Sequence, residues 1–231
     1  GVSNTDGTIT STVSANVDAG FSIVSYTGNG TAGATVGHGL SSAPEMIIDK
    51  SRTTTCGSMA WGTYHKDIGN NKVIWLNETS AAGTNAGWNN TSPTSSVFTL
   101  GGLCENNSNA DTFIAYCFHS VEGYSKVGSY TGNGSTDGPF VHCGFRPAYV
   151  MVKRTDSTGH WPIGDNKRDG YNPENDPLYA NLSNVEGTDN WWDGLSNGFK
   201  IRSSTGDWNA SGGTYIFLAF AEHPFKYSTA K

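Results

Sequence analysis

The sequence predicts an all-β protein made of two tandem antiparallel β-sandwich-like repeats of about 100 residues each. Three observations lead to this fold class. A six-residue segment occurs twice, short apolar runs alternate with turn residues, and charged residues make up only 15% of the chain. The sequence contains no stretch with sustained 3.6-residue periodicity, which argues against long helices.

The repeat organises the chain. Ser25–Gly30 reads Ser-Tyr-Thr-Gly-Asn-Gly, and Ser129–Gly134 is identical to it. Further similar segments follow in the same order, namely 44–50 with 147–153, 97–100 with 198–201, and 112–118 with 214–220. This collinear order predicts a first β repeat over 21–126 and a second over 127–231. Residues 1–20 are expected to form an N-terminal connector or an edge strand.

Each repeat contains runs of strand length. The run 21–26 is rich in β-branched and aromatic residues and is bounded by glycine. The runs 46–50 and 149–153 each follow a proline, where its missing N–H costs least. The last runs, 112–118 and 214–220, are almost entirely apolar, which predicts a strand in each unit that is buried on both faces or central in the sandwich.

The glycines of the repeated hexapeptide predict turns. Gly-Asn-Gly at 28–30 and at 132–134 favours backbone with positive φ. A phosphate-binding loop would need a following Lys-Ser or Lys-Thr pair and a helix, and the sequence has neither there.

Composition excludes several partners. The net charge is −6, and the 14 Lys and Arg residues do not cluster, so nucleic acid is not an expected partner. No apolar run approaches the length of a membrane helix, and no signal peptide is visible, so membrane insertion is not expected. A chain that begins with Gly1 is expected to be a fragment or a processed or tagged product.

The sequence shows no catalytic pattern, so we expect a non-enzyme without cofactor or metal site. It has neither a Gly-x-Ser-x-Gly elbow nor a His-Glu-x-x-His motif. His38 and His142 occupy equivalent positions of the repeat, which favours a structural role over metal or ligand binding. Carboxylates that could in principle cleave glycosides occur at Asp165, Asp169, Glu174, Asp176, Asp189 and Asp193. Solvated loop residues are the simpler interpretation.

The four cysteines are Cys56, Cys104, Cys117 and Cys143. Their spacing contains no Cys-x-x-Cys pair. Free thiols are the expectation, with a single disulfide as the alternative.

Tryptophan is the most suggestive residue type. Trp88, Trp191, Trp192 and Trp208 lie among Asn, Gly and Thr, a context typical of loops. Loop indoles beside polar side chains can form a glycan-binding platform, because a sugar offers an apolar face and directional hydroxyls. The alternative is that these rings close the ends of the sandwich.

Several segments together resemble a domain of marine bacteriophage virion proteins. These are 21–30, Gly37–Leu40 followed by Pro44, 146–154, and the closing 219–227. Proteins of that kind are similar to tail fibres or tail-associated structural proteins, and the resemblance covers about residues 5–227. It implies a location in the virion and contact with the host surface, and it carries no catalytic residues.

The expectation is therefore an extracellular, non-enzymatic virion structural or adhesion protein that contacts host-surface glycans. By analogy with phage fibres, we expect a homo-oligomer such as a trimer, with other virion proteins as partners and multivalent weak binding. A capsid or tail decoration protein, a polysaccharide depolymerase and a bacterial adhesin are the alternatives.

Overall fold

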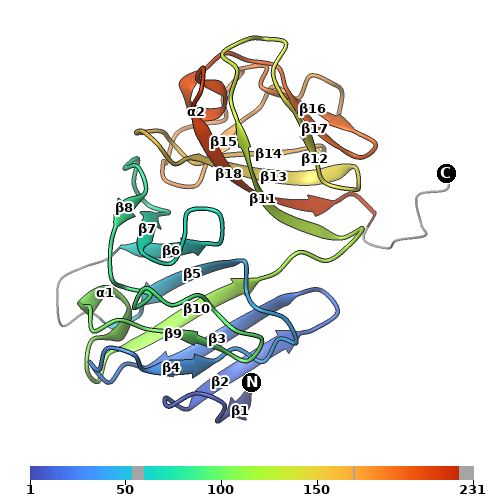
Figure 1. Cartoon of the computed structure of the whole chain (residues 1–231). Helices are drawn as coiled ribbons and strands as arrows, with labels where there is room; N and C mark the ends of the chain where they lie inside the picture. Colours follow the sequence, from blue (N-terminus) through green and yellow to red (C-terminus); the bar gives the residue numbers. More distant parts are fainter. Residues whose placement is uncertain (54–59, 169, 224–231) are drawn as a thin grey trace. The chain divides into compact units, whose positions relative to one another are not determined.

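The computed structural model of the chain describes residues 1–53, 60–168 and 170–223. As the sequence predicts, it is nearly all β, with antiparallel strand pairing throughout the named strands (Figure 1). The described part contains no helix long and apolar enough to cross a bilayer. The chain divides into two compact units, of which unit 1 comprises Gly1–Leu76 and Ala82–His119, and unit 2 comprises Asn77–Ala81 and Ser120–Lys231.

Unit 1 combines an eight-stranded sheet, in the order β1-β2-β3-β10-β5-β6-β7-β8, with a two-stranded sheet, β4-β9. Its elements are β1 (Val2–Asn4), β2 (Ser11–Asn16), β3 (Phe21–Thr27), β4 (Thr35–Gly37), β5 (Met46–Ser51), β6 (Trp61–His65), β7 (Lys72–Trp75), β8 (Gly83–Thr84), β9 (Val97–Thr99), α1 (Cys104–Asn107) and β10 (Thr112–Phe118). The hydrophobic core takes side chains from both sheets, including Val24 and Phe113 from the large sheet and Phe98 from the small one.

Unit 2 combines a five-stranded sheet, in the order β11-β18-β13-β14-β15, with a three-stranded sheet, β12-β17-β16. Its elements are β11 (Ser125–Thr131), β12 (Phe140–His142), β13 (Pro147–Arg154), β14 (Pro162–Asp165), β15 (Leu178–Tyr179), β16 (Trp192–Leu195), β17 (Gly198–Ile201), α2 (Gly206–Asn209) and β18 (Thr214–Ala221). Val152 and Phe217 of the first sheet share a core with Phe199 of the second.

The last strand of each unit is central, as predicted. β10 pairs with β3 on one side and β5 on the other. β18 pairs in the same way with β11 and β13. In β10, buried and half-buried residues alternate, which is the pattern of a strand with one face on a core. Most residues of β18 are buried, so its long apolar run is explained by burial of both faces.

The two units repeat each other in their side-chain contacts as well as in strand order. The ring of Tyr26 in β3 stacks on Phe113 in β10 with centroids 5.2 Å apart. The ring of Tyr130 in β11 stacks on Tyr215 in β18 at 4.9 Å. A single-turn helix, α1 or α2, precedes the last strand in both units. The predicted duplication is therefore confirmed.

The repeated hexapeptide ends in turns that require glycine. Gly30 and Gly134 have φ angles of 68° and 70°, a region that residues with a Cβ rarely adopt. A Cβ placed on Gly28 would lie only 2.3 Å from the carbonyl oxygen of Ser108. The predicted turn role of this segment is thus confirmed.

A buried asparagine holds each of these turns. Oδ1 of Asn107 accepts the backbone N–H of Asn29 (3.0 Å), and Oδ1 of Asn209 accepts that of Asn133 (2.8 Å). The Nδ2 groups of both side chains donate to backbone carbonyls of the surrounding loops. Because the asparagines are buried, these bonds satisfy groups that water does not reach.

The unit boundaries differ from the predicted repeat boundaries. The expected boundary after residue 126 would cut β11, because this strand begins at Ser125, the counterpart of Phe21. Residues 1–20 contribute β1 and β2 to the edge of the unit 1 sheet. The segment Asn77–Ala81 belongs to unit 2, although it lies within the first repeat in the sequence. Sequence similarity does not reveal this exchange, because the contacts that hold the segment are made to its backbone.

Candidate functional site

The four tryptophans predicted to form an exposed glycan platform lie inside the protein. Trp88 is 2% exposed, and Trp191, Trp192 and Trp208 are 0% exposed. The prediction that these rings are exposed is therefore wrong, and a sugar cannot stack on their faces in this conformation. Their polar neighbours in the sequence suggested loops, but several of those neighbours are themselves buried, as Asn209 shows.

Three of these rings pack against one another in the core of unit 2. Trp191 lies 5.8 Å from Trp192 and 5.3 Å from Trp208, measured between ring centroids. A Cβ on Gly164 in β14 would lie 2.4 Å from Nε1 of Trp192, so the backbone itself touches the indoles. This close packing agrees with the alternative that the rings close the interior of the sandwich.

The structure instead brings together a set of polar side chains that the sequence did not single out. We call it the unit 2 polar cluster, and its members are Lys153, His160, Tyr179, Asn181 and Asp207. They come from the end of β13, the loop after it, β15, the loop after β15, and α2. Because these residues are scattered between positions 153 and 207 without a common motif, no sequence signal marked them.

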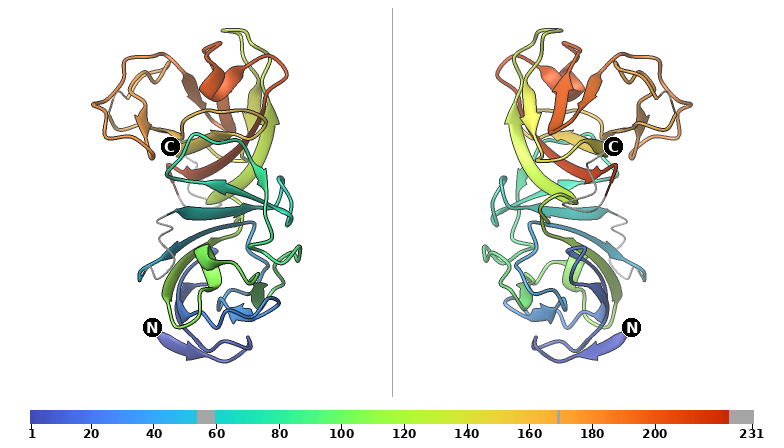
Figure 2. Two further views of the ribbon diagram at one scale, coloured as in Figure 1. Left: turned by 90° about the vertical axis from the view of Figure 1, so that its left-hand side faces the viewer. Right: turned by 90° about the vertical axis from the view of Figure 1, so that its right-hand side faces the viewer.

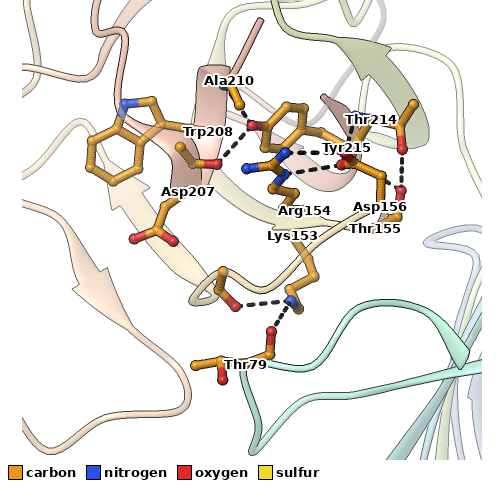
Figure 3. A network of polar contacts seen from close by, with 12 residues as sticks. Thr79, Lys153, Arg154, Thr155, Asp156, Asp207, Trp208, Ala210, Thr214 and Tyr215 are labelled. Carbon is orange, nitrogen blue, oxygen red and sulfur yellow. Dashed lines mark hydrogen bonds and ion pairs between the residues drawn. The ribbon is translucent and has the colours of Figure 1, made fainter. Parts of the chain in front are cut away.

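Lys153 is the fully buried member of the cluster (Figure 3). Its side chain is 0% exposed, and Nζ donates to the carbonyl oxygens of Thr79 (3.1 Å) and Gly159 (2.9 Å). The N–H of Gly159 donates to the same Thr79 oxygen (2.9 Å). Burial lowers the pKa of Lys153 to about 8, and the nearby negative charge of Asp207 partly opposes this effect. The hydrogen bond from Lys153 to Thr79 therefore helps to hold the segment Asn77–Ala81 within unit 2.

Asp207 connects α2 with the loop after β13. Its Oδ1 accepts the backbone N–H of His160 at 2.8 Å. In Figure 3 its carboxylate points away from the ion pair between Arg154 and Asp156. The next residue, Trp208, is fully buried, so the single helical turn of α2 sends one side chain into the core and leaves Asp207 half-buried.

His160 and Asn181 fix each other's orientation. The N–H of Trp161 donates to Oδ1 of Asn181 (3.0 Å), which determines how the amide is turned. Nδ2 of Asn181 then faces Nδ1 of His160 at 3.0 Å. Since Nδ2 can only donate, Nδ1 must accept, and the proton of the neutral imidazole lies on Nε2.

Tyr179 supplies the aromatic surface of the cluster. Its ring packs partly against the hydrophobic core and meets the ring of His160 edge-on, with centroids 5.4 Å apart. Partial burial raises the pKa of Tyr179, and the negative charges of Asp207 and Asp189 add to this effect.

A second group of contacts holds α2 in place beside the cluster. The Tyr215 hydroxyl donates to the carbonyl of Gly206 and accepts the N–H of Ala210, both at 2.7 Å. Arg154 donates to both carboxylate oxygens of Asp156, at 3.0 and 3.1 Å (Figure 3). The two Tyr215 bonds tie both ends of α2 to β18, which fixes the position of Asp207.

The histidines predicted to be equivalent differ in their surroundings. His38 is buried, accepts the N–H of Leu40 at Nδ1 (3.1 Å) and contacts the carbonyl of Thr94 through Nε2 (3.1 Å). Burial lowers its pKa. His142, at the end of β12, is exposed. His38 thus has the structural role that the repeat suggested.

The carboxylates considered for glycoside cleavage are engaged in different ways. Asp165 pairs with Arg168 (2.7 Å) and Asp193 with Arg202 (3.3 Å). Glu174 is buried, and Asp169 lies outside the described residues. Within the described part of the chain, no group of three or more His, Cys, Asp or Glu side chains could hold a metal ion.

The expectation that all four cysteines are free thiols is wrong. Cys104 is disulfide-bonded, whereas Cys117 and Cys143 are free and buried. Burial raises the pKa of the Cys143 thiol to about 12 and that of Cys117 further, so neither is a reactive thiolate at neutral pH. Cys56 lies outside the described residues.

Comparison with known proteins gives one match. Residues 1–224 match the family described as "Domain of unknown function (DUF7483)". No curated protein and no solved structure matches the chain.

Proposed function

The chain belongs to the DUF7483 family, and we propose that it is a non-enzymatic virion structural and adhesion module, a tail fibre or similar appendage that contacts host-surface glycans. The observation that carries this proposal is the use of the duplicated residues. In both units the repeated tyrosine, glycines and asparagine hold strands and turns in place rather than presenting reactive groups.

Such a framework suits a mechanical and adhesive role. The turn of each unit is held by an asparagine with bonds to several backbone groups, so the loops that it supports do not need a ligand to order them. The disulfide at Cys104 is typical of proteins that work in oxidising surroundings, which favours an extracellular location.

Whole-cell binding tests this proposal. We expect the purified chain to bind intact cells of a susceptible host and to release no reducing sugar ends from their surface polysaccharide. Release of reducing ends would contradict the non-enzymatic role and support the depolymerase alternative. Failure of the intact chain to bind cells would contradict the adhesive role and leave the decoration protein as the better account.

One observation favours that decoration role, in which the partner is a second copy of the chain or another virion protein. The segment between β14 and β16 projects from one side of unit 2, in orange in Figure 2. It exposes large apolar side chains, Tyr171 at 82%, Leu178 at 38%, Leu182 at 37% and Val185 at 89%. Sedimentation of the wild-type chain and of a variant carrying Tyr171→Ser and Val185→Ser tests self-association through this segment. The expected result is an oligomer that the variant weakens, and a wild-type monomer would contradict it.

A further inference from the structure

We propose that His160, Tyr179, Asn181 and Asp207 form a binding site on unit 2 for one ring of a neutral, hydroxyl-rich sugar. This inference rests on the proposed adhesive function and adds to it the place of contact and the chemical class of the ligand. It assigns recognition to side chains that the repeat does not copy, in place of the buried tryptophans.

The first argument is the hydrogen-bonding capacity that remains in the cluster. Oδ1 of Asp207 and Nδ1 of His160 are occupied by contacts within the unit. Oδ2 of Asp207, Nε2–H of His160 and the second N–H of Asn181 bond to no other described residue. The cluster therefore retains one strong acceptor and two donors, and a sugar with adjacent hydroxyls can satisfy both kinds of group.

The second argument is the aromatic surface beside these groups. Tyr179 is half-buried, and its contact with the core and with His160 limits its movement. An aromatic ring next to fixed polar atoms matches the C–H face and the hydroxyl edge of a pyranose. This combination of groups is the one that the sequence predicted for the tryptophans.

The third argument is that the site is already ordered. Asp207 is held by the backbone of His160, and Asn181 is held by that of Trp161. The carbonyl of Gly159, next to His160, is held by Lys153. A ligand would therefore bind without ordering these side chains, which reduces the entropic cost of association.

The charge of the surroundings favours a neutral ligand. The cation of Lys153 lies close to Asp207, and Arg154 forms an ion pair with Asp156. Asp189 adds further negative charge near Tyr179. An acidic sugar would meet these carboxylates without a free cation among the described residues of the cluster, whereas a neutral sugar meets no such repulsion.

Two substitutions test the site with little change to the fold. Asp207→Asn keeps an oxygen that can accept the N–H of His160 but removes the charged acceptor. Tyr179→Leu keeps apolar packing against the core but removes the flat ring. Glu105→Gln is the matched control, because Glu105 occupies the position of Asp207 in α1 of unit 1, where it accepts a hydrogen bond from Asn85 (3.1 Å).

The readout is binding to an array of immobilised neutral oligosaccharides of glucose, galactose and mannose, with uronic-acid and sialic-acid glycans as the acidic set. Titration with the free sugar of the best neutral hit gives affinities, and circular dichroism with thermal melting confirms folding of each variant. We expect Asp207→Asn and Tyr179→Leu to bind about tenfold or more weakly than the wild type, and Glu105→Gln to bind like the wild type.

The outcomes separate the site from the adhesive function. If the wild type binds cells but both cluster variants bind glycans as well as it does, the adhesive function stands and this site is wrong. If only acidic glycans bind, or no glycan binds, the proposed ligand is wrong even where cells are bound. If the wild type binds neither cells nor glycans, the proposed function fails as well.

Discussion

Units 1 and 2 place equivalent tyrosines, Tyr26 and Tyr130, at the same point of the same fold but surround their hydroxyls differently. In both units the hydroxyl lies close to a carbonyl oxygen of the short helix, that of Asn106 at 2.8 Å and that of Trp208 at 2.7 Å. In unit 1 it also lies 2.8 Å from Oδ2 of Asp49. The shared contact joins β3 to α1 in unit 1 and β11 to α2 in unit 2, and the additional contact to Asp49 distinguishes unit 1.

The pair in unit 1 is a carboxyl group kept neutral by burial. Asp49 is 1% exposed, and burial raises its pKa to about 8. Tyr26 has one hydroxyl proton and cannot donate to two acceptors. The hydroxyl lies within donating distance of both Oδ2 of Asp49 and the carbonyl of Asn106, so it can donate to only one of them at a time.

Unit 2 replaces this polar centre with apolar side chains. Asp49 in β5 pairs with Ala115 of the central strand β10, and Val152 in β13 pairs with Phe217, the equivalent residue of β18. Trp208 is the third residue of α2, as Asn106 is of α1. The indole of Trp208 packs against Trp191 in the core. The difference teaches that the duplicated fold depends on the tyrosine, the helix carbonyl and the turn asparagine, while the rest of each core has diverged.

The largest loss of stability is expected when Trp208 of unit 2 is replaced by asparagine, the residue that unit 1 has at this position. Trp208→Asn removes a fully buried indole from a close-packed cluster. We expect the free energy of unfolding of unit 2 to fall by about 3–5 kcal/mol. Chemical denaturation followed by tryptophan fluorescence measures this loss. A loss below about 1 kcal/mol would mean that the core tolerates either residue and that the comparison is misplaced.

The second largest loss of stability should be equal in the two units. Asn107→Ala and Asn209→Ala each remove several hydrogen bonds to the backbone of a turn and leave buried groups unpaired. We expect each variant to lose about 2–4 kcal/mol of stability. Thermal unfolding of both variants provides the measurement, and a large loss in one with none in the other would break the equivalence of the units.

Substitution of Asp49 should raise the stability of the protein instead of lowering it, and the gain should depend on pH. In the unfolded chain Asp49 ionises near pH 4, but in the folded protein it stays protonated to about pH 8. Folding must therefore take up a proton, and this contribution lowers stability progressively as pH rises from 4 to 8. Asp49→Asn removes this penalty, so we expect a gain in stability that is large at pH 8 and disappears near pH 4. Denaturant melts of both proteins at the two pH values measure it, and a gain independent of pH would be inconsistent with a protonated Asp49.

The smallest effect concerns the equivalent lysines. Lys153 is buried and donates hydrogen bonds to two carbonyl oxygens, whereas its counterpart Lys50 is half-buried. Lys153→Met leaves the carbonyl of Gly159 without this donor, and we expect a loss of about 1 kcal/mol at pH 7. Because the pKa of Lys153 is lower in the folded protein than in the unfolded chain, wild-type stability should rise from pH 8 to pH 10, and the loss in Lys153→Met should grow with it. A loss that stays constant over this pH range would contradict the lowered pKa of Lys153.

Much of the fold could be predicted because the repeat preserved what the fold requires. The hexapeptide marks a turn with glycines at positive φ, and the apolar runs mark the central strands. The burial of the tryptophans could not be read from their neighbours, since polar and small residues in this chain also lie inside. Gly164 is an example, because its missing side chain makes room for the indole of Trp192.

The polar cluster could not be predicted at all. Its members are up to 54 residues apart, and only the pairing of β14 with β15 and the position of α2 bring them together. Neither the hydrogen bond between His160 and Asn181 nor the one from the His160 N–H to Asp207 follows a spacing rule. A sequence repeat reveals shared architecture, whereas a site formed by unshared residues requires coordinates.

Amide hydrogen exchange at Gly30 and Gly134 tests most directly whether the copied segments serve structure. Each N–H donates to the carbonyl of the turn-holding asparagine, at 2.8 Å to Asn107 and 3.0 Å to Asn209. Although Gly30 is exposed, we predict that both amides exchange as slowly as amides of the central strands β10 and β18. Rapid exchange at either glycine would contradict a structural role for the repeated turn and would return it to the candidates for ligand binding.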